Sequence, residues 1–281
     1  MRVAIAVAAI VTLRFLRIVY ARLALDKSPL ARFMPQFLQI YVQEGLEERV
    51  YQPDTFANFI ADYGALKDVM GKRECKIAIT DLKSHLESTG YELLDVLDVK
   101  IGHHTFSNRE AMFRGGAKAG KNIFNKLQMT FGEKIADAGF LIATGSNKLA
   151  RQVNYKNSKK NLELFVTGLT SDAQEMLLKR LSWIGEAVEE SRLALIGSSI
   201  LLMKVSQDSQ ASVFPYVIDP AHGFFEDEIQ GNEANLQDKY RRRYDDFFEF
   251  YLNSYTQGLG SVIEVIASIK PPEQWIEMSE R

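Results

Sequence analysis

The sequence has little of several residue types on which whole classes of protein depend. Among its 281 residues only Cys75 is a cysteine, so neither a disulfide framework nor a thiolate metal cluster can form within the chain. Four scattered histidines disfavour a zinc site built from histidine. An excess of positive charge is also missing: 34 Lys and Arg stand against 36 Asp and Glu, for a net charge of −2. This balance argues against a dedicated nucleic-acid binder, which is usually basic overall.

A long apolar run is absent from the start of the chain. The stretch Val3–Leu13 is apolar except for one threonine, but it is shorter than the roughly 20 residues that span a bilayer. Arginines follow it where a signal peptide would carry its small-residue cleavage site. We expect a buried strand or the first turns of a helix here, and we disfavour the alternative of membrane contact through residues 3–25.

The composition that is present is that of an ordinary globular protein. Hydrophobic residues make up 46% and charged residues 25%, which excludes intrinsic disorder and collagen-like repeats. A chain of this length buries a sizeable core as one large two-lobed domain or two small ones. Together with the single cysteine, this composition predicts a cytoplasmic or nuclear protein.

Apolar spacing predicts a mixture of helices and short strands. In chain order we expect a helix over 13–25 ending before Pro29, a helix start at Pro53-Asp54, strands at 75–79 and 93–101, and a basic helix over 109–134. The pair Ser171 and Gln174 forms a capping-box signature. The helix behind it buries Leu177, Leu181, Ile184 and Val188.

The second half of the chain adds an insert, a hairpin and a closing helix. Residues 147–161 carry five cations and no acid, which predicts an exposed basic loop or insert. Residues 200–203 and 213–218 predict the two strands of a hairpin, and Pro215 indicates that the second is an edge strand or contains an irregularity. The last helix is predicted from about Tyr244 to Ile269.

Three aspartates follow apolar runs: Asp81, Asp98 and Asp219. A carboxylate just past a buried strand is held rigidly, as a metal ligand or a general base requires. Taken singly, each is more often the cap of a turn or a helix. Both interpretations stay open for each residue.

Asp98 and Lys100 are two residues apart, so in a strand their side chains project from the same face. A carboxylate beside an ammonium suits phosphoryl transfer, because the first accepts a hydroxyl proton and the second neutralises phosphate charge. The alternative is a simple ion pair on a half-exposed strand. The spacing of Asp98 and Lys100 alone favours neither the phosphoryl-transfer interpretation nor the ion-pair interpretation.

These residues belong to an ordered set of motifs that resembles the inositol polyphosphate kinase family over roughly residues 14–266. Asp98-x-Lys100-x-Gly102 resembles the Asp-x-Lys-x-Gly signature of that family, and Thr105-Phe106 follows at the family's spacing. The other matching segments are Leu30–Phe37, Ile77–Leu82, Ile196–Leu202, Val217–His222 and the closing Tyr255, Gly258-Leu259 and Ile263. A lone Asp-x-Lys-x-Gly motif is weak evidence for the family, whereas the ordered set of motifs is specific evidence for it.

The resemblance implies a two-lobed α/β (α+β) fold with antiparallel sheets and flanking helices, which binds ATP and Mg²⁺ between its lobes. It implies that Asp98 activates the inositol hydroxyl, that Lys100 contacts substrate phosphates and that Asp219 holds the magnesium ion. Ser198 and Ser199 would lie in the metal and phosphate region, and Asp81 near the ribose and adenine. Magnesium prefers such oxygen ligands, one or two carboxylates together with phosphate.

A basic stretch gives the substrate a further contact. Arg114, Lys118 and Lys121 are expected to bind the polyanionic inositol phosphate, because several cations can offset its charge. The alternative is a solvated helix face.

The sequence also differs from the family pattern. Leu94 stands for the signature's proline, His104 for a basic residue and Pro220 for a phenylalanine, and Gly139–Ile142 lacks an arginine. The family carries a lysine on a strand before the first helix, whereas the first lysine here is Lys27. We therefore expect residues 1–82 to form a short or divergent nucleotide lobe and hinge, and residues 83–281 the catalytic and substrate lobe. The alternative function is a degenerate kinase-like protein that binds inositol phosphates or a protein partner.

Overall fold

The structure is a computed structural model of the chain. It describes residues 3–6, 19–20, 22–24, 26–44, 47–55, 57–58, 74–102, 139–145, 155–220, 223–226 and 238–269. The fold is mixed α/β with antiparallel sheets and helices, as the sequence predicts. The predicted helix over 109–134 and the residues Arg114, Lys118 and Lys121 lie outside the described residues.

A four-stranded antiparallel sheet forms the N-terminal part. Its order is β1 (Val3–Ala6), β4 (Glu74–Thr80), β2 (Phe37–Glu44) and β3 (Glu47–Tyr51). The first apolar run thus contributes a strand at Val3–Ala6, and the strand predicted at 75–79 is confirmed within β4. Two short 3-10 helices flank this sheet's strands along the chain, η1 (Pro29–Phe33) and η2 (Pro53–Thr55). The helix start predicted at Pro53-Asp54 is therefore confirmed as a 3-10 turn.

Residues 19–20 and 22–24 are helical, and the chain turns at Asp26 and Lys27 before η1. The predicted end of this helix before Pro29 is therefore confirmed. Tyr20 and Leu23 are buried, and the Tyr20 ring stacks on Phe37 with the ring centroids 5.1 Å apart. This short helical segment thus packs against the first residue of β2.

The central sheet carries the signature residues. Its order is β6 (Phe140–Gly145), β5 (Glu92–Ile101), β8 (Ser199–Gln207) and β9 (Gln210–Ile218), all antiparallel. The predicted hairpin is confirmed, with a two-residue turn at Asp208 and Ser209. Both have positive φ, 51° and 66°, as a type I′ turn requires. Pro215 lies in the edge strand, where its missing N–H costs no ladder hydrogen bond.

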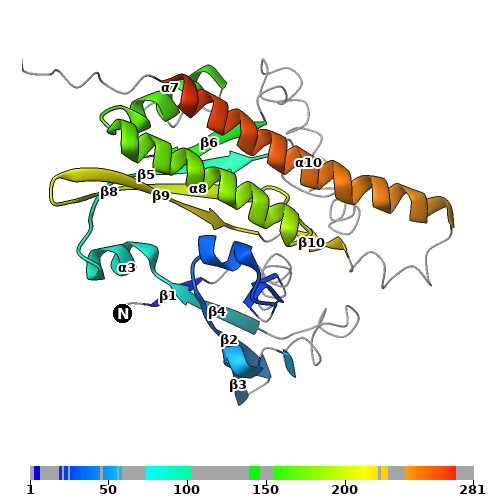
Figure 1. Cartoon of the computed structure of the whole chain (residues 1–281). Helices are drawn as coiled ribbons and strands as arrows, with labels where there is room; N and C mark the ends of the chain where they lie inside the picture. The colour runs from blue at the N-terminus through cyan, green and yellow to red at the C-terminus, as the bar shows by residue number, and fades with distance from the viewer. Residues whose placement is uncertain are drawn as a thin grey trace, which may run out of the picture.

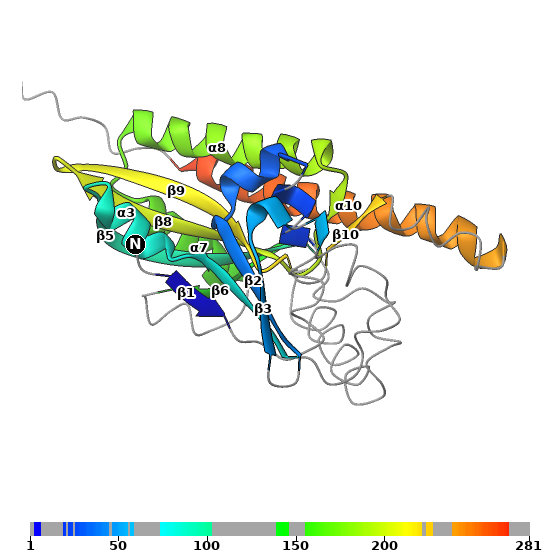
Figure 2. The same cartoon turned by 90° about the horizontal axis from the view of Figure 1, so that it is seen from below.

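Three helices cover one face of the central sheet: α7 (Tyr155–Val166), α8 (Ser171–Glu190) and α10 (Asp238–Ser268) (Figure 1). The four predicted core residues of α8 are all buried, with exposed fractions of 0% at Leu177, Leu181, Ile184 and Val188. The other face is covered in part by α3 (Leu82–Ser88). In both views this helix lies on the side of the sheet away from α8 (Figures 1 and 2).

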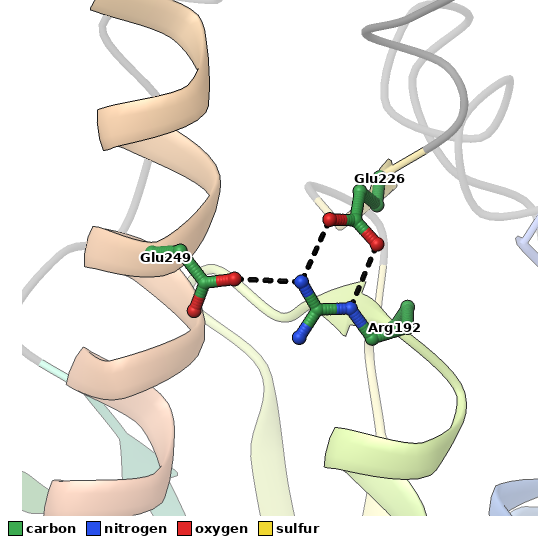
Figure 3. A network of polar contacts seen from close by, with 3 residues as sticks. All are labelled: Arg192, Glu226 and Glu249. Carbon is green, nitrogen blue, oxygen red and sulfur yellow. Dashed lines mark hydrogen bonds and ion pairs between the residues drawn. The ribbon is translucent and has the colours of Figure 1, made fainter.

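An arginine network joins the end of α8 to α10 and to the small sheet of β7 (Leu193–Ala194) and β10 (Phe224–Phe225). Arg192 follows α8 with φ 45°, and its guanidinium donates to both carboxylate oxygens of Glu226 at 2.7 Å. It also donates to Glu249 of α10 at 2.6 Å (Figure 3). One planar side chain therefore ties three elements together.

The exposed basic insert predicted at 147–161 is wrong for its second part. Residues from Tyr155 onward form the start of α7, in which the Ser158 hydroxyl accepts a hydrogen bond from the Ile142 N–H at 3.2 Å. The apolar residues of this helix, such as Leu162 and Phe165, follow the basic stretch. The polar composition of the first turns therefore concealed the helix start, and residues 147–154 lie outside the described residues.

Two helix starts also differ from their predictions. Thr170 caps α8 by accepting from the Ala173 N–H at 3.2 Å, whereas buried Gln174 donates to the Ile266 and Ile269 carbonyls at the end of α10. The predicted capping box is thus wrong, because the Gln174 side chain is engaged by carbonyls at the end of α10 instead of by the start of its own helix. Helix α10 begins at Asp238 rather than near Tyr244. The sequence did not indicate this start because the charge-dense first turns of the helix show no apolar periodicity.

Candidate functional site

Strand β5 separates apolar from polar side chains by its alternation. Leu97, Val99 and Ile101 are buried at 4%, 0% and 1% exposure on the face under the helices. Asp98 and Lys100 are half-buried and project from the opposite face, as their spacing predicts. The polar pair thus lies on the side of the sheet away from α7, α8 and α10.

The neighbouring strands extend this face. Ser199 of β8 lies opposite Lys100, and Ile218 of β9 lies opposite Ser199. Side chains directly opposite in an antiparallel pair share a face. Further along the same face, Met203 and Val205 pack with Leu86 of α3. The face is therefore apolar beneath α3 and polar at the end that carries Asp98 and Lys100.

Lys100 is held by neighbours from β8. Its ammonium donates to the Ser199 hydroxyl at 3.2 Å and to the Gly197 carbonyl at 3.4 Å. An ammonium has three N–H donors, so one remains for a further acceptor. Among the described residues no ion pair joins Lys100 to Asp98, so the ion-pair alternative does not describe this strand.

Asp98 has an oxygen atom that lacks a donor. Its Oδ1 is buried and makes no hydrogen bond to any described residue. A buried polar atom without a partner is costly, and in native proteins it is often associated with a functional group. The acceptor capacity of this oxygen is therefore unused among the described residues.

Ser198 and Ser199 are both buried but face different sides. Ser199 bonds to Lys100 on the polar face, whereas the Ser198 carbonyl accepts from the Ile101 N–H at 3.1 Å. The preceding Gly197 has φ 64°, a conformation that favours glycine. This segment thus turns into β8 beside the last residues of β5.

Asp219 directly follows β9 at the polar end of the sheet. It is exposed and has φ 55°, a left-handed conformation that aspartate tolerates better than most residues. Burial, and then the charge of Asp219, raise the pKa of the Tyr20 phenol. The carboxylate is therefore within electrostatic range of the buried Tyr20 hydroxyl.

Asp98 lies on β5 and Asp219 just past β9, two strands away, which is about 10 Å at the usual strand spacing. The register adds to this separation, because Tyr216, three residues before Asp219, is the β9 residue in line with Asp98. Two oxygens on one magnesium ion lie within about 4 Å of each other. The two carboxylates are thus suited to separate roles rather than to one shared ion. Among the described residues no group of three or more His, Cys, Asp or Glu forms a ready metal cluster.

Asp81 caps α3. Its Oδ1 accepts from the Lys83 N–H at 3.1 Å, and its Oδ2 accepts from the Ser84 hydroxyl at 2.8 Å. The Ser84 hydrogen bond is the main cause that lowers the pKa of this carboxyl. The helix-cap interpretation describes its local contacts, and its contact with a nucleotide stays a prediction.

The closing helix touches the end of β5 through glycine. A Cβ at Gly258 would lie 2.2 Å from the Gly139 carbonyl oxygen and 2.9 Å from the Gly102 nitrogen, so only glycine fits there. This gives a physical reason for the Tyr255-x-x-Gly258 spacing. The sequence motif pointed to this helix, but not to the backbone atoms that Gly258 meets.

No family model matches the chain, and no curated protein matches it. In the described part of the chain no helix is long and apolar enough to cross a membrane. Among solved structures the chain is similar to the inositol phosphate multikinase Ipk2 of S. cerevisiae, solved with ADP and Mn²⁺. The match covers 94% of this chain and 98% of that chain, with a TM-score of 0.49 and 16% identity.

Proposed function

We propose that the chain is an ATP-dependent kinase that phosphorylates a hydroxyl group of an inositol polyphosphate. The observation that carries the proposal is the polar end of the central sheet. There Asp98, with an unpartnered carboxylate oxygen, shares a face with Lys100, whose ammonium is held beside Ser199. The ordered motifs around these residues supply the class of substrate.

Asp98 is the proposed proton acceptor. Its free oxygen accepts a hydrogen bond from the substrate hydroxyl and takes the proton as the hydroxyl oxygen attacks phosphorus. The rigid strand on either side of Asp98 orients the carboxylate, which favours a fixed geometry.

Lys100 is the proposed phosphate contact. Ser199 and Gly197 use two of its donors and direct the third, so the ammonium can bind one phosphate oxygen of the substrate. We propose that Arg114, Lys118 and Lys121 add further positive charge around the same polyanion.

Asp219 and the serines fit a nucleotide-bound metal. Asp219 offers an exposed carboxylate at the strand end, an oxygen donor of the kind that Mg²⁺ binds together with phosphates. We propose that the segment of Ser198 and Ser199 lies beside the phosphates, with the Ser199 hydroxyl on that face and the fully buried Ser198 contributing through its backbone. We propose that Asp81 lies beside the ribose and adenine. When bound, Mg²⁺ and ATP supply the phosphoryl group and neutralise its charge.

The proposal is tested by incubating the full chain with ATP, Mg²⁺ and a panel of inositol phosphates. We expect ATP consumption that depends on one or a few members of the panel, and a product with one more phosphate. A folded chain that consumes no ATP across the panel would contradict the proposal.

A second function, a non-catalytic inositol phosphate binder, is favoured by the first strand. β1 (Val3–Ala6) contains no lysine, whereas the family's nucleotide lobe carries one on a strand before the first helix. This candidate predicts thermal stabilisation by inositol hexakisphosphate and none by ATP with Mg²⁺. Stabilisation by both, together with turnover, favours the kinase.

A further inference from the structure

The outer edge of β9 exposes a row of backbone groups. Among the described strands β9 pairs with β8 alone, so it forms one edge of the central sheet. The two-residue turn makes Gln207 and Gln210 a hydrogen-bonded pair, and such pairs alternate along an antiparallel ladder. The β9 residues whose backbone groups point away from β8 are therefore Ala211, Val213, Pro215 and Val217. A row of this kind is a template for pairing with a strand of another chain.

Two residues interrupt this row at its middle. Pro215 has no backbone N–H, so the row lacks one donor there. The Val213 carbonyl already accepts a hydrogen bond from the Arg180 guanidinium of α8 at 2.7 Å. A strand that pairs with this part of the edge must therefore displace Arg180.

Arg180 reaches the Val213 carbonyl by passing around the edge of the sheet. Helix α8 lies alongside β9 on one face of the sheet (Figures 1 and 2). The guanidinium carbon lies 4.3 Å from the centroid of the Phe214 ring, which packs against Tyr91 and the residues beneath α3 on the opposite face. The side chain thus covers the outer backbone of β9 between the two faces. An arginine suits this position because its planar group stacks on a ring and also donates hydrogen bonds.

The surface beside Arg180 carries two large apolar side chains. Met176 and Trp183 of α8 are 41% and 47% exposed, and they lie four residues before and three residues after Arg180. Residues at these spacings are neighbours on the surface of a helix. A second copy of the chain brings the same strand edge and the same two side chains, and a two-fold contact makes identical surfaces complementary. Pairing of two β9 edges would thus bury apolar area from both copies, which favours association.

We infer that Arg180 keeps the β9 edge closed to a second copy of this chain. Pairing of two β9 edges requires the guanidinium of each copy to leave Val213 and the Phe214 ring, and Pro215 offers no N–H in return. The β9 edge beside Met176 and Trp183 is therefore a self-association surface that one arginine closes. This inference does not rest on the kinase proposal, since none of these residues belongs to the proposed active site.

The test is sedimentation velocity of the full chain carrying Arg180→Met, over a wide range of protein concentration. Methionine keeps an unbranched stem but has neither the charge nor the N–H donors of arginine. We expect the dissociation constant of the dimer to fall by at least about 10-fold relative to the wild type, because pairing no longer breaks a hydrogen bond from a charged donor in each copy. Lys179→Met is the matched control, since it removes a positive charge and adds the same side chain at the neighbouring exposed position on α8.

Hydrogen exchange of the backbone amides locates the contact. Pairing through the edge protects the outward N–H groups of Ala211, Val213 and Val217. Exchange in residues 210–218 of Arg180→Met should therefore slow as the protein concentration rises, whereas the wild type and Lys179→Met should show no such change.

The inference is overturned if Arg180→Met folds and associates no more strongly than Lys179→Met, or if it associates without slower exchange in residues 210–218. A wild-type chain that already dimerises with these amides protected overturns it as well, because the edge is then open. If Arg180→Met fails to fold, Arg180→Gln, which also lacks the guanidinium, decides in the same way.

Discussion

At the scale of single residues, Gly258 shows how closely the closing helix approaches the candidate site. A side chain there meets backbone atoms of Gly139 and Gly102, which cannot move aside as a flexible side chain would. We predict that Gly258→Ala destabilises the fold by about 1–3 kcal/mol, the usual cost of overpacking. Thermal or urea unfolding measures the change.

Gly260, two residues further along α10, is the matched control. A Cβ at this position meets no atom within 4 Å. Because alanine is the better helix former by up to about 1 kcal/mol, Gly260→Ala should leave stability unchanged or raise it. Equal destabilisation by the two substitutions would contradict the close approach of α10 to β5.

At the scale of elements, the cap of α3 should make stability depend on pH. The pKa of Asp81 is held below its ordinary value near 4, mainly by the Ser84 hydroxyl. A carboxyl group whose pKa is lower in the folded state than in the unfolded state stabilises the fold. This stabilisation is fully present above the pKa of the unfolded state, and it is lost as the pH falls through the pKa of the folded state.

Asp81→Ala should therefore cost about 1 kcal/mol at pH 7, as for other N-cap residues. The difference in stability between Asp81→Ala and the wild type should shrink as the pH falls from about 5 to 3. Melting temperatures of both proteins over this pH range measure the difference. A difference that is the same at pH 7 and pH 3 would show that the carboxylate is not the capping group.

The Arg192 network is a second contact between elements. Its three side chains are between 38% and 51% exposed, so solvent screening limits its contribution. We predict that Arg192→Met costs about 1 kcal/mol and lowers Tm by roughly 2 °C at low salt, and less in 1 M salt. Lys179→Met, which removes an exposed pair with Glu175, is the control and should cost less. An Arg192→Met loss that does not exceed the control's would show that the network adds nothing.

Local patterns predicted the parts of the fold that repeat with a fixed period. The alternation along Leu97–Ile101 placed Asp98 and Lys100 on one face, and spacings of three and four gave the buried face of α8. The start of α7 and the role of Gln174 were missed because they depend on contacts made far along the chain. Gln174, for example, bonds to carbonyls at positions 266 and 269.

The same limit applies to the site. Lys100 is 99 residues from Ser199 in the chain, so no local pattern could show what holds its ammonium. Asp81 had two open interpretations, and only the structure showed both of its oxygens engaged in a cap. The family motifs indicated which segments matter, whereas sheet register shows which of their side chains meet.

At the scale of the whole molecule, two four-stranded sheets follow one another along the described part of the chain, and β4 leads from the N-terminal sheet through Asp81 and α3 to β5. The division into a lobe of residues 1–82 and a lobe of residues 83–281 stays a prediction. In the kinase proposal, substrate and nucleotide meet on the polar face of the central sheet.

The most direct test of this account is the rate of phosphate transfer from ATP to an inositol polyphosphate by Asp98→Asn, compared with wild type. The substitution keeps the size of the side chain and one acceptor oxygen, but it removes the negative charge and the proton acceptor. We predict a kcat lower by about 10²- to 10⁴-fold, the usual contribution of a general base. Thermal stabilisation by the substrate should be retained, and Asp95→Asn on the same strand should stay within about twofold of wild type. Phosphate transfer by Asp98→Asn at the wild-type rate would show that Asp98 is not the proton acceptor.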